Sequence, residues 1–301
     1  MLGTLATIFI IIAIGLLARH FRIAGEKEYN LLNNIIYNCT LPALIFMSLI
    51  AAGSQAFRDF PLIASNALAI LIMMALILLA CFALRLPRKL IALLLLASFY
   101  GNIVYMGYPV VELAFGQPGI PIVVVAATIY NIIIFSLGLA LLQYLSLDHE
   151  KIRLDHITNH LIKNPLLLST AAGLLFLASN LTLPVYLATA LDSFGHITAP
   201  LALFSLGIFM YGRNPLANIK LNLAIAALKM AVFPLLFIFI AKSLGLSGLG
   251  YSVSLVEAAM PLAVTNFILA TQYKLDANLV SSAIVLTTLL SPLSLYFFGT
   301  L

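Results

Sequence analysis

Apolar runs of about twenty residues recur from one end of this 301-residue chain to the other. A helix needs roughly 20 apolar residues to cross a hydrocarbon core of about 30 Å. Only 8% of the residues are charged, against about 25% in soluble domains, so water-soluble surfaces cannot be built around these runs. The pattern predicts an all-α polytopic membrane protein that is embedded in the lipid bilayer.

Charged residues, glycines and prolines divide the apolar sequence into ten predicted transmembrane helices. A polar stretch that begins at Leu147 separates five of them from the other five, which suggests two halves, residues 1–150 and 151–301. The predicted spans are residues 2–18, 29–51, 60–84, 90–115, 119–146, 165–180, 184–211, 217–242, 247–271 and 277–300.

Lysine and arginine gather in alternate loops between the predicted spans. Twelve of the fifteen follow the first, third, fifth, seventh or ninth span; Arg58 and Lys242 lie on the other side, and Lys229 lies within a span. Basic loops favour the cytoplasmic side, so both termini are expected outside a cell membrane. Topology accounts for the net charge of +5, and no nucleic-acid partner is expected.

Two short sequences recur at an offset of 158 residues. "AIGLL" at 13–17 resembles "AAGLL" at 171–175, and "TLPALIF" at 40–46 resembles "TAPLALF" at 198–204. Since each half has five spans, an odd number, the second copy must cross the membrane in the opposite direction. Inverted repeats of this kind are typical of secondary transporters. The sequence therefore predicts a 5+5 inverted repeat.

Predicted spans four and nine contain residues that interrupt helices. Span four carries Gly101, Asn102, Gly107 and Pro109, and span nine carries Pro261 and Asn266. Proline removes a backbone donor and glycine permits unwinding, and free backbone groups persist at membrane depth only where they line a cavity. We expect helices 4 and 9 to be broken, to cross near the middle of the membrane, and to present their ends to bound ions.

Other polar residues within the predicted spans allow more than one role. Glu257 is a candidate cation ligand or proton carrier, with a structural ion pair as the alternative. Lys229 either attracts a substrate carboxylate or neutralises an acid, for which the candidates are Glu257, Glu112 and Asp192. Glu112 belongs either to the site or to an outer vestibule, and Asn131 either faces the crossing or joins helices by hydrogen bonding.

The predicted site combines these residues. Asparagine amides can donate to a carboxylate and accept from a cation. No catalytic residue is expected, because the spans contain no HExxH motif, Ser/His dyad or Gly-Asp protease pattern, and no cofactor is expected beyond Na⁺ as a coupling ion at Glu257. The predicted substrate-binding residues are Asn102, Gly107, Pro109, Pro261, Asn266 and Lys229; the predicted cation-binding or proton-carrying residues are Glu257, Asn102, Glu112 and Asn131.

Several segments resemble the auxin efflux carrier family. "NIVYMGYP" at 102–109 resembles the Asn-x-x-x-x-Gly-x-Pro signature of its fourth span. Val104 and Glu257 depart from many bacterial relatives, and "EAAM" at 257–260 instead resembles the acidic position of sodium-coupled bile-acid-type proteins. Further segments resemble the family in the same order: "TLPALIF", "KNP" at 163–165, "APLALFSLG" at 199–207 and "AAMPLAVTNFILA" at 258–270.

This resemblance implies ten helices in a 5+5 inverted repeat, with spans 1, 2, 6 and 7 as a scaffold and spans 3–5 and 8–10 as a transport domain. It also implies a homodimer, an elevator-like movement and, as in bacterial relatives, substrates such as malate or malonate. We therefore expect a secondary transporter of small carboxylates coupled to Na⁺ or H⁺. A cation/proton antiporter on the same fold is the alternative, and the composition is also compatible with a channel or membrane receptor.

Overall fold

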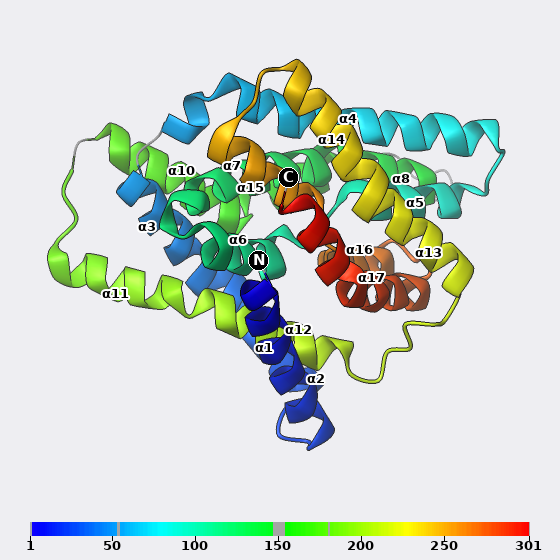
Figure 1. The fold of residues 1–301 in the computed structure, drawn as a ribbon, viewed down its shortest axis with the longest axis horizontal. Helices are drawn as coiled ribbons and strands as arrows, with labels where there is room; N and C mark the ends of the chain where they lie inside the picture. Colours follow the sequence, from blue (N-terminus) through cyan, green and yellow to red (C-terminus); the bar gives the residue numbers. More distant parts are fainter. Residues whose placement is uncertain (1, 53–54, 147–153, 180, 301) are drawn as a thin grey trace. The chain divides into compact units, whose positions relative to one another are not determined.

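The computed structural model describes residues 2–52, 55–146, 154–179 and 181–300, and the chain folds there into helices joined by short connections (Figure 1). These residues contain no β-strand, only one isolated bridge between Gly101 and Leu262. The prediction of an all-helical protein is confirmed. The chain forms two compact units, each assembled from three segments, and each is described on its own.

Unit 1 contains Met1–Phe60, Val104–Thr128 and Ile162–Gly212. The π-helical segment η3 (Ile103–Gly107) begins one residue before the second of these segments. Helix α7 starts in unit 1 and continues into unit 2 after Thr128. Its helices are α1 (Leu2–His20), α2 (Glu26–Ile35), η1 (Ile36–Thr40), α3 (Leu41–Ala52), η2 (Gln55–Arg58), α6 (Tyr108–Phe115), η4 (Gln117–Gly119), the first part of α7 (Ile120–Ile133), α10 (Pro165–Ala178), α11 (Val185–His196) and α12 (Thr198–Met210).

Unit 2 contains Pro61–Ile103, Ile129–Leu161 and Arg213–Leu301. Its helices are α4 (Phe60–Ala83), α5 (Arg88–Phe99), the end of α7, η5 (Ile134–Gly138), α8 (Leu139–Ser146), α9 (Leu154–Ile162), α13 (Ile219–Ala227), η6 (Leu228–Val232), α14 (Phe233–Ser243), α15 (Gly248–Ala258), α16 (Thr265–Gln272) and α17 (Ala277–Phe298). The predicted boundary between the two sequence halves, at 150/151, lies outside the described residues, so this division stays a prediction.

Seven helices in the described part of the chain are long and apolar enough to cross a membrane. They correspond to the first, second, third, fifth, seventh, eighth and tenth predicted spans. The sixth is the shorter apolar helix α10. The fourth and ninth are each divided: α5 ends at Phe99 before η3 begins at Ile103, and α15 ends at Ala258 before α16 begins at Thr265.

Local sequence explains two helix starts. Asn164, the middle residue of the "KNP" segment, caps α10: its side-chain oxygen accepts from the backbone N–H of Leu166 at 3.0 Å. Pro165 then takes the first helical position, where a missing N–H does no harm. Asp276 caps α17 in the same way and accepts from the N–H of Leu279 at 2.9 Å. Each cap supplies an acceptor for N–H groups that a helix leaves unpaired.

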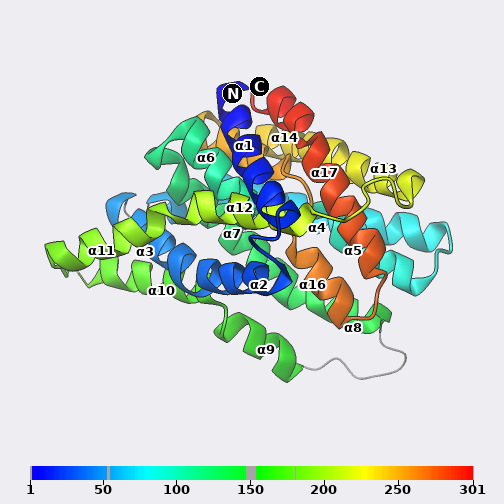
Figure 2. The ribbon, with the colours of Figure 1, turned by 90° about the horizontal axis from the view of Figure 1, so that it is seen from below.

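Glycines set the helix packing of unit 1. α1 lies across α12 in both ribbon views (Figures 1 and 2), and the two backbones approach at Gly15 and Gly207. A Cβ atom on either glycine would overlap a backbone carbonyl oxygen of the opposite helix. Small residues allow this close approach, which is a common way of joining helices in membranes. α10 packs on α3 in a similar manner, with Gly173 against Leu49.

Candidate functional site

Two non-helical stretches of unit 2, Tyr100–Asn102 and Ala259–Val264, run beside each other in opposite directions, and we call them the paired segments. The N–H of Asn102 donates to the carbonyl of Pro261 at 2.7 Å, and the N–H of Ala263 donates to the carbonyl of Tyr100 at 3.1 Å. These bonds satisfy backbone groups that the interrupted helices leave free, as a membrane interior requires.

The interruption in the fourth predicted span comes earlier than its proline. Gly107 has a helical backbone (φ −62°), and Pro109 is in the first turn of α6, where proline is tolerated. Of the two glycines expected to permit unwinding, Gly101 lies in the non-helical stretch, whereas Gly107 stays helical, so the prediction is wrong for Gly107 alone. In the ninth predicted span, Pro261 itself lies in a paired segment.

Three buried asparagines surround Tyr100 in unit 2. The side-chain amide of Asn266, in the first turn of α16, donates to the carbonyl of Tyr100 at 3.2 Å. The Tyr100 hydroxyl donates to the side-chain oxygen of Asn131 at 3.2 Å. Asn102 is only 1% exposed. Two of the predicted asparagines, Asn131 and Asn266, are thus joined through a tyrosine that was not predicted, and Asn102 lies two residues after it in the same paired segment.

Lys229, in η6, is fully buried beside the paired segments. Its ammonium donates to the carbonyl of Ala258, the last residue of α15, at 2.5 Å and lies 4.9 Å from the centre of the Phe233 ring. A Cβ atom on Gly101 would come within 3.0 Å of the Lys229 side chain. A cation at the C-terminal end of a helix is favourable, so this lysine stabilises the end of α15.

Glu257 is also fully buried, in the last turn of α15. Neither carboxylate oxygen has a hydrogen-bond partner among the described residues. Of the three acids considered for Lys229, Glu257 is the one that attracts it electrostatically, although the ammonium itself donates to Ala258. A buried carboxylate with free acceptor positions can receive a cation or a proton.

Helix α17 supports the paired segments through hydroxyl groups. The N–H of Leu262 donates to the hydroxyl oxygen of Thr287 at 3.2 Å. Ser294 donates to the carbonyl of Ala259 at 3.1 Å and to that of Met230 at 3.2 Å. Thr287 and Ser294 are not among the residues predicted from the sequence. Single hydroxyls in an apolar helix are common, and no sequence pattern distinguishes these two from the rest.

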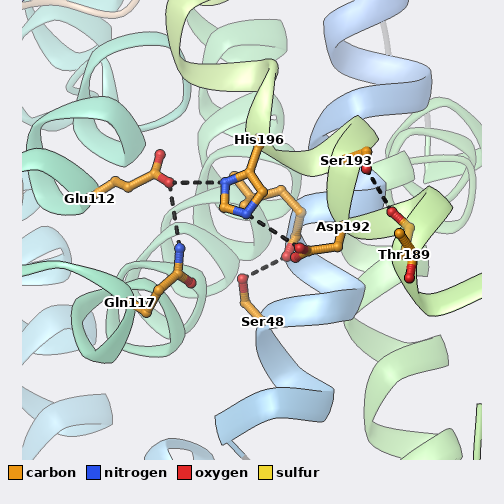
Figure 3. A network of polar contacts seen from close by, with 8 residues as sticks. Ser48, Glu112, Gln117, Thr189, Asp192, Ser193 and His196 are labelled. Carbon is orange, nitrogen blue, oxygen red and sulfur yellow. Dashed lines mark hydrogen bonds and ion pairs between the residues drawn. The ribbon is translucent and has the colours of Figure 1, made fainter. Parts of the chain in front are cut away.

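The remaining predicted site residues, Gly107, Pro109 and Glu112, belong to unit 1. Glu112 on α6 accepts from the side-chain amide of Gln117 at 3.5 Å and lies 3.5 Å from His196 (Figure 3). Six of the nine predicted residues therefore gather around the paired segments of unit 2. The other three belong to unit 1.

The known proteins that this chain resembles are membrane transporters. A family described as Membrane transport protein matches residues 1–299. A protein of Methanothermobacter thermautotrophicus named "Uncharacterized transporter" is 29% identical, covering 97% of this chain and 95% of its own. A Rhizobium meliloti protein named "Putative malonate transporter" is 27% identical over 86% of this chain and 82% of its own. Auxin efflux carrier component 1 of Arabidopsis thaliana is 27% identical over 46% of this chain and 23% of its own.

Proposed function

Because this chain belongs to the membrane transport protein family, that of the auxin efflux carriers, we propose that it is a secondary transporter of small organic anions, mainly carboxylates. The family and its named relatives are transporters, not enzymes. The observation that carries the proposal is the gathering of buried polar side chains around the paired segments of unit 2, at the interruptions of two apolar helices. Such residues are costly in a membrane, and those that occur there mark substrate and ion pathways.

The anion would bind where donors and positive charge converge. Asn102 and Asn266 supply amides, Lys229 supplies a positive charge, and the N-terminus of α16 contributes the positive end of its dipole. Pro261 keeps the second paired segment out of the helix. Gly107 and Pro109, in unit 1, stay predicted substrate-binding residues from the family signature.

The coupling ion would be Na⁺ or H⁺ at Glu257. Its two carboxylate oxygens and the side-chain oxygen of Asn266 have no hydrogen-bond partner among the described residues. Hard oxygen donors of this kind suit a hard cation, so the residues fit Na⁺, and a carboxylate also binds a proton. Asn102, Asn131 and Glu112 stay predicted members of the cation path.

The proposed architecture is the ten-helix 5+5 inverted repeat, with alternating access by an elevator-like displacement in a homodimer. Helix pairing in unit 1 supports the repeat: α1 packs on α12 and α10 packs on α3. The first pair joins span one to span seven, and the second joins span six to span two. The 158-residue offset relates span one to span six and span two to span seven, so the two pairs are equivalent under the repeat. A pseudo-symmetric pairing of this kind is expected of an inverted repeat.

The basic loops are expected to face the cytoplasm and both termini the outside. With Cys39 and Cys81 replaced by alanine, cysteines introduced at Lys89 and Leu216 should react with a membrane-impermeant thiol reagent only after the cells are opened. A cysteine at Ser247, predicted on the opposite side, should react in intact cells and serves as the matched control. Labelling of Lys89→Cys and Leu216→Cys from outside would reverse the topology.

Thermal stabilisation tests the substrate class. Purified protein is heated with malonate and with other small mono- and dicarboxylates, with and without Na⁺, at two pH values. A ligand that binds the folded state stabilises it, by about 2.7 kcal/mol at a hundred times its dissociation constant. We expect at least one carboxylate to raise the melting temperature, and more so with the coupling cation. No response to any carboxylate would contradict the proposal.

Two variants test whether the thermal stabilisation by carboxylate depends on the predicted site. Asn102→Ala should weaken the stabilisation by carboxylate, because it removes an amide donor from the buried cluster. Asn38→Ala, at an exposed position of η1 in unit 1, changes the same residue type outside the predicted site and should leave the response intact. Equal responses in the two variants would remove Asn102 from the site.

A cation/proton antiporter is the second candidate, and the fully buried Glu257 with its free oxygens favours it. The same measurement separates the two functions. If Na⁺ or pH alone changes the melting temperature while no carboxylate does, the antiporter becomes the better proposal.

A further inference from the structure

A polar cluster in unit 1 links two helices that are distant in the sequence. His196, the last residue of α11, has both ring nitrogens directed at carboxylates (Figure 3). Its Nδ1 lies 3.5 Å from Oε1 of Glu112 on α6, and its Nε2 lies 3.3 Å from Oδ2 of Asp192, one turn earlier on α11. Gln117 donates to the same Glu112 oxygen at 3.5 Å. We call these four residues the His196 cluster.

The protonation state of His196 determines how many of these carboxylates it can donate to. A neutral imidazole has one N–H donor and one bare nitrogen, which can only accept. Ionised carboxylates can only accept as well, so a neutral His196 can satisfy Glu112 or Asp192 but not both. An imidazolium has two donors and can satisfy both. The position at the C-terminal end of α11 also favours a positive charge.

The surroundings hold few other ionisable groups. α11 packs mainly on α3, α12 and η1, and α6 packs mainly on α1, α12 and η4. Of these elements, α3, α12 and η4 carry no ionisable side chain. η1 carries Tyr37 and Cys39, and the last turn of α1 carries Arg19 and His20, which have other partners in Glu26 and Tyr211. Among the described residues of these elements, Glu112 and Asp192 are the carboxylates that His196 faces.

The side chains of the His196 cluster are only partly covered by the rest of the protein. The side chains of His196 and Asp192 are 51% and 58% exposed, and that of Glu112 is 21% exposed. Charged groups facing hydrocarbon would be costly, so this exposed side is expected to face an aqueous path. A histidine in such a place can exchange its proton with the solvent, and histidine ordinarily changes charge between about pH 5 and 8.

We propose that Glu112, His196 and Asp192 form a proton-binding site that ties α6 to α11 when the imidazole is protonated and releases α6 when it is neutral. The imidazole nitrogen forms an N–H bond with a proton from a hydronium ion, whose O–H bond breaks to leave water, and no other covalent bond changes. Since α6 follows Asn102 in the chain through η3 alone, the site would give the transporter a pH response that is separate from Glu257. This regulatory role rests on the proposed function, because it assumes that the protein is a transporter.

Hydrogen exchange of the purified full-length protein tests the site without any substrate. Amides of α6 are compared at pH 5.5 and 7.5 after correction for intrinsic exchange rates, because local opening of α6 governs their protection. We expect about two- to fivefold more protection at pH 5.5 in the native protein, as fits partly exposed ion pairs. In His196→Gln, which keeps a polar side chain but cannot become charged, the two pH values should give equal protection.

His20→Gln is the matched control. His20 also ends a helix and is exposed, but it contacts the Tyr211 hydroxyl instead of carboxylates, so this variant should keep the native difference. If His196→Gln does not fold, Glu112→Gln removes the link from the α6 side and should abolish the difference as well. A pH difference that survives in either folded variant overturns the proposal. A missing carboxylate response with an intact pH difference would instead contradict only the transport function.

Discussion

Replacing Gly15 by alanine is expected to destabilise the protein by ~3 kcal/mol or more, the upper part of the range for overpacked sites. The added methyl group would overlap the carbonyl oxygen of Phe204 across the contact between α1 and α12. Backbone atoms cannot move aside as a flexible side chain can. The two helices would have to separate, and the packing along their contact in unit 1 would be lost.

The same helix provides the control. Gly3 has no atom within 4 Å of the position that a Cβ would take, so Gly3→Ala meets open space. Alanine is preferred over glycine within helices by roughly 0.5–1 kcal/mol, so this variant should be as stable as the native protein or slightly more so. Melting temperature and the yield of monodisperse protein in detergent measure the difference. Equal stability of Gly15→Ala and Gly3→Ala would show that the helices are not in backbone contact.

The sequence predicts the class of this fold well, because the physical constraint is strong. A chain with so few charges can hide its backbone polar groups in a bilayer only by forming helices. Seven of the predicted spans correspond to helices of spanning length, and Pro165–Ala178 matches the start of the sixth. The place where the fourth span is interrupted is less predictable. Gly101, Gly107 and Pro109 can all weaken a helix, and only contacts with Pro261 and Ala263 select Gly101.

The candidate site is predictable where side-chain chemistry identifies it. Asn102, Asn131 and Asn266 stand out because amides are costly in an apolar helix, and the structure gathers them. Tyr100 is different: its hydroxyl bonds Asn131, but its contacts with Asn266 and Ala263 go through the backbone carbonyl, which every residue possesses. His196 is missed for another reason: its partner Glu112 comes from a different helix, and only the folded chain shows that the two meet.

Replacing Glu257 by glutamine is expected to abolish the response of carboxylate uptake to the coupling cation. Coupling between two bound ligands corresponds to about 5–150-fold changes in affinity, so uptake into proteoliposomes should differ by that order with and without the Na⁺ or proton gradient. In Glu257→Gln the ratio should fall to about one, because an amide neither carries a proton nor offers a charged ligand. Glu26→Gln, an exposed carboxylate on α2, should leave the ratio unchanged.

Loss of coupling in Glu257→Gln could also result from a destabilised protein, and this explanation must be separated from the loss of a cation site. Glu257 attracts Lys229, and removing one member of a buried pair leaves the other charge uncompensated, at a cost of about 3–5 kcal/mol. A destabilised protein would also transport poorly. Removing both charges, in Glu257→Gln combined with Lys229→Met, should recover most of that stability, because neither charge is then left alone.

The double variant therefore distinguishes a cation site from a structural pair. Thermal stabilisation by Na⁺ or by a change of pH, measured without carboxylate, does not depend on Lys229 as an anion-binding residue. If Glu257 receives the coupling cation, the double variant regains stability but shows no stabilisation by the cation. If Glu257 only balances Lys229, cation stabilisation returns together with the stability, and the coupling site must then be sought elsewhere among the buried oxygens of unit 2.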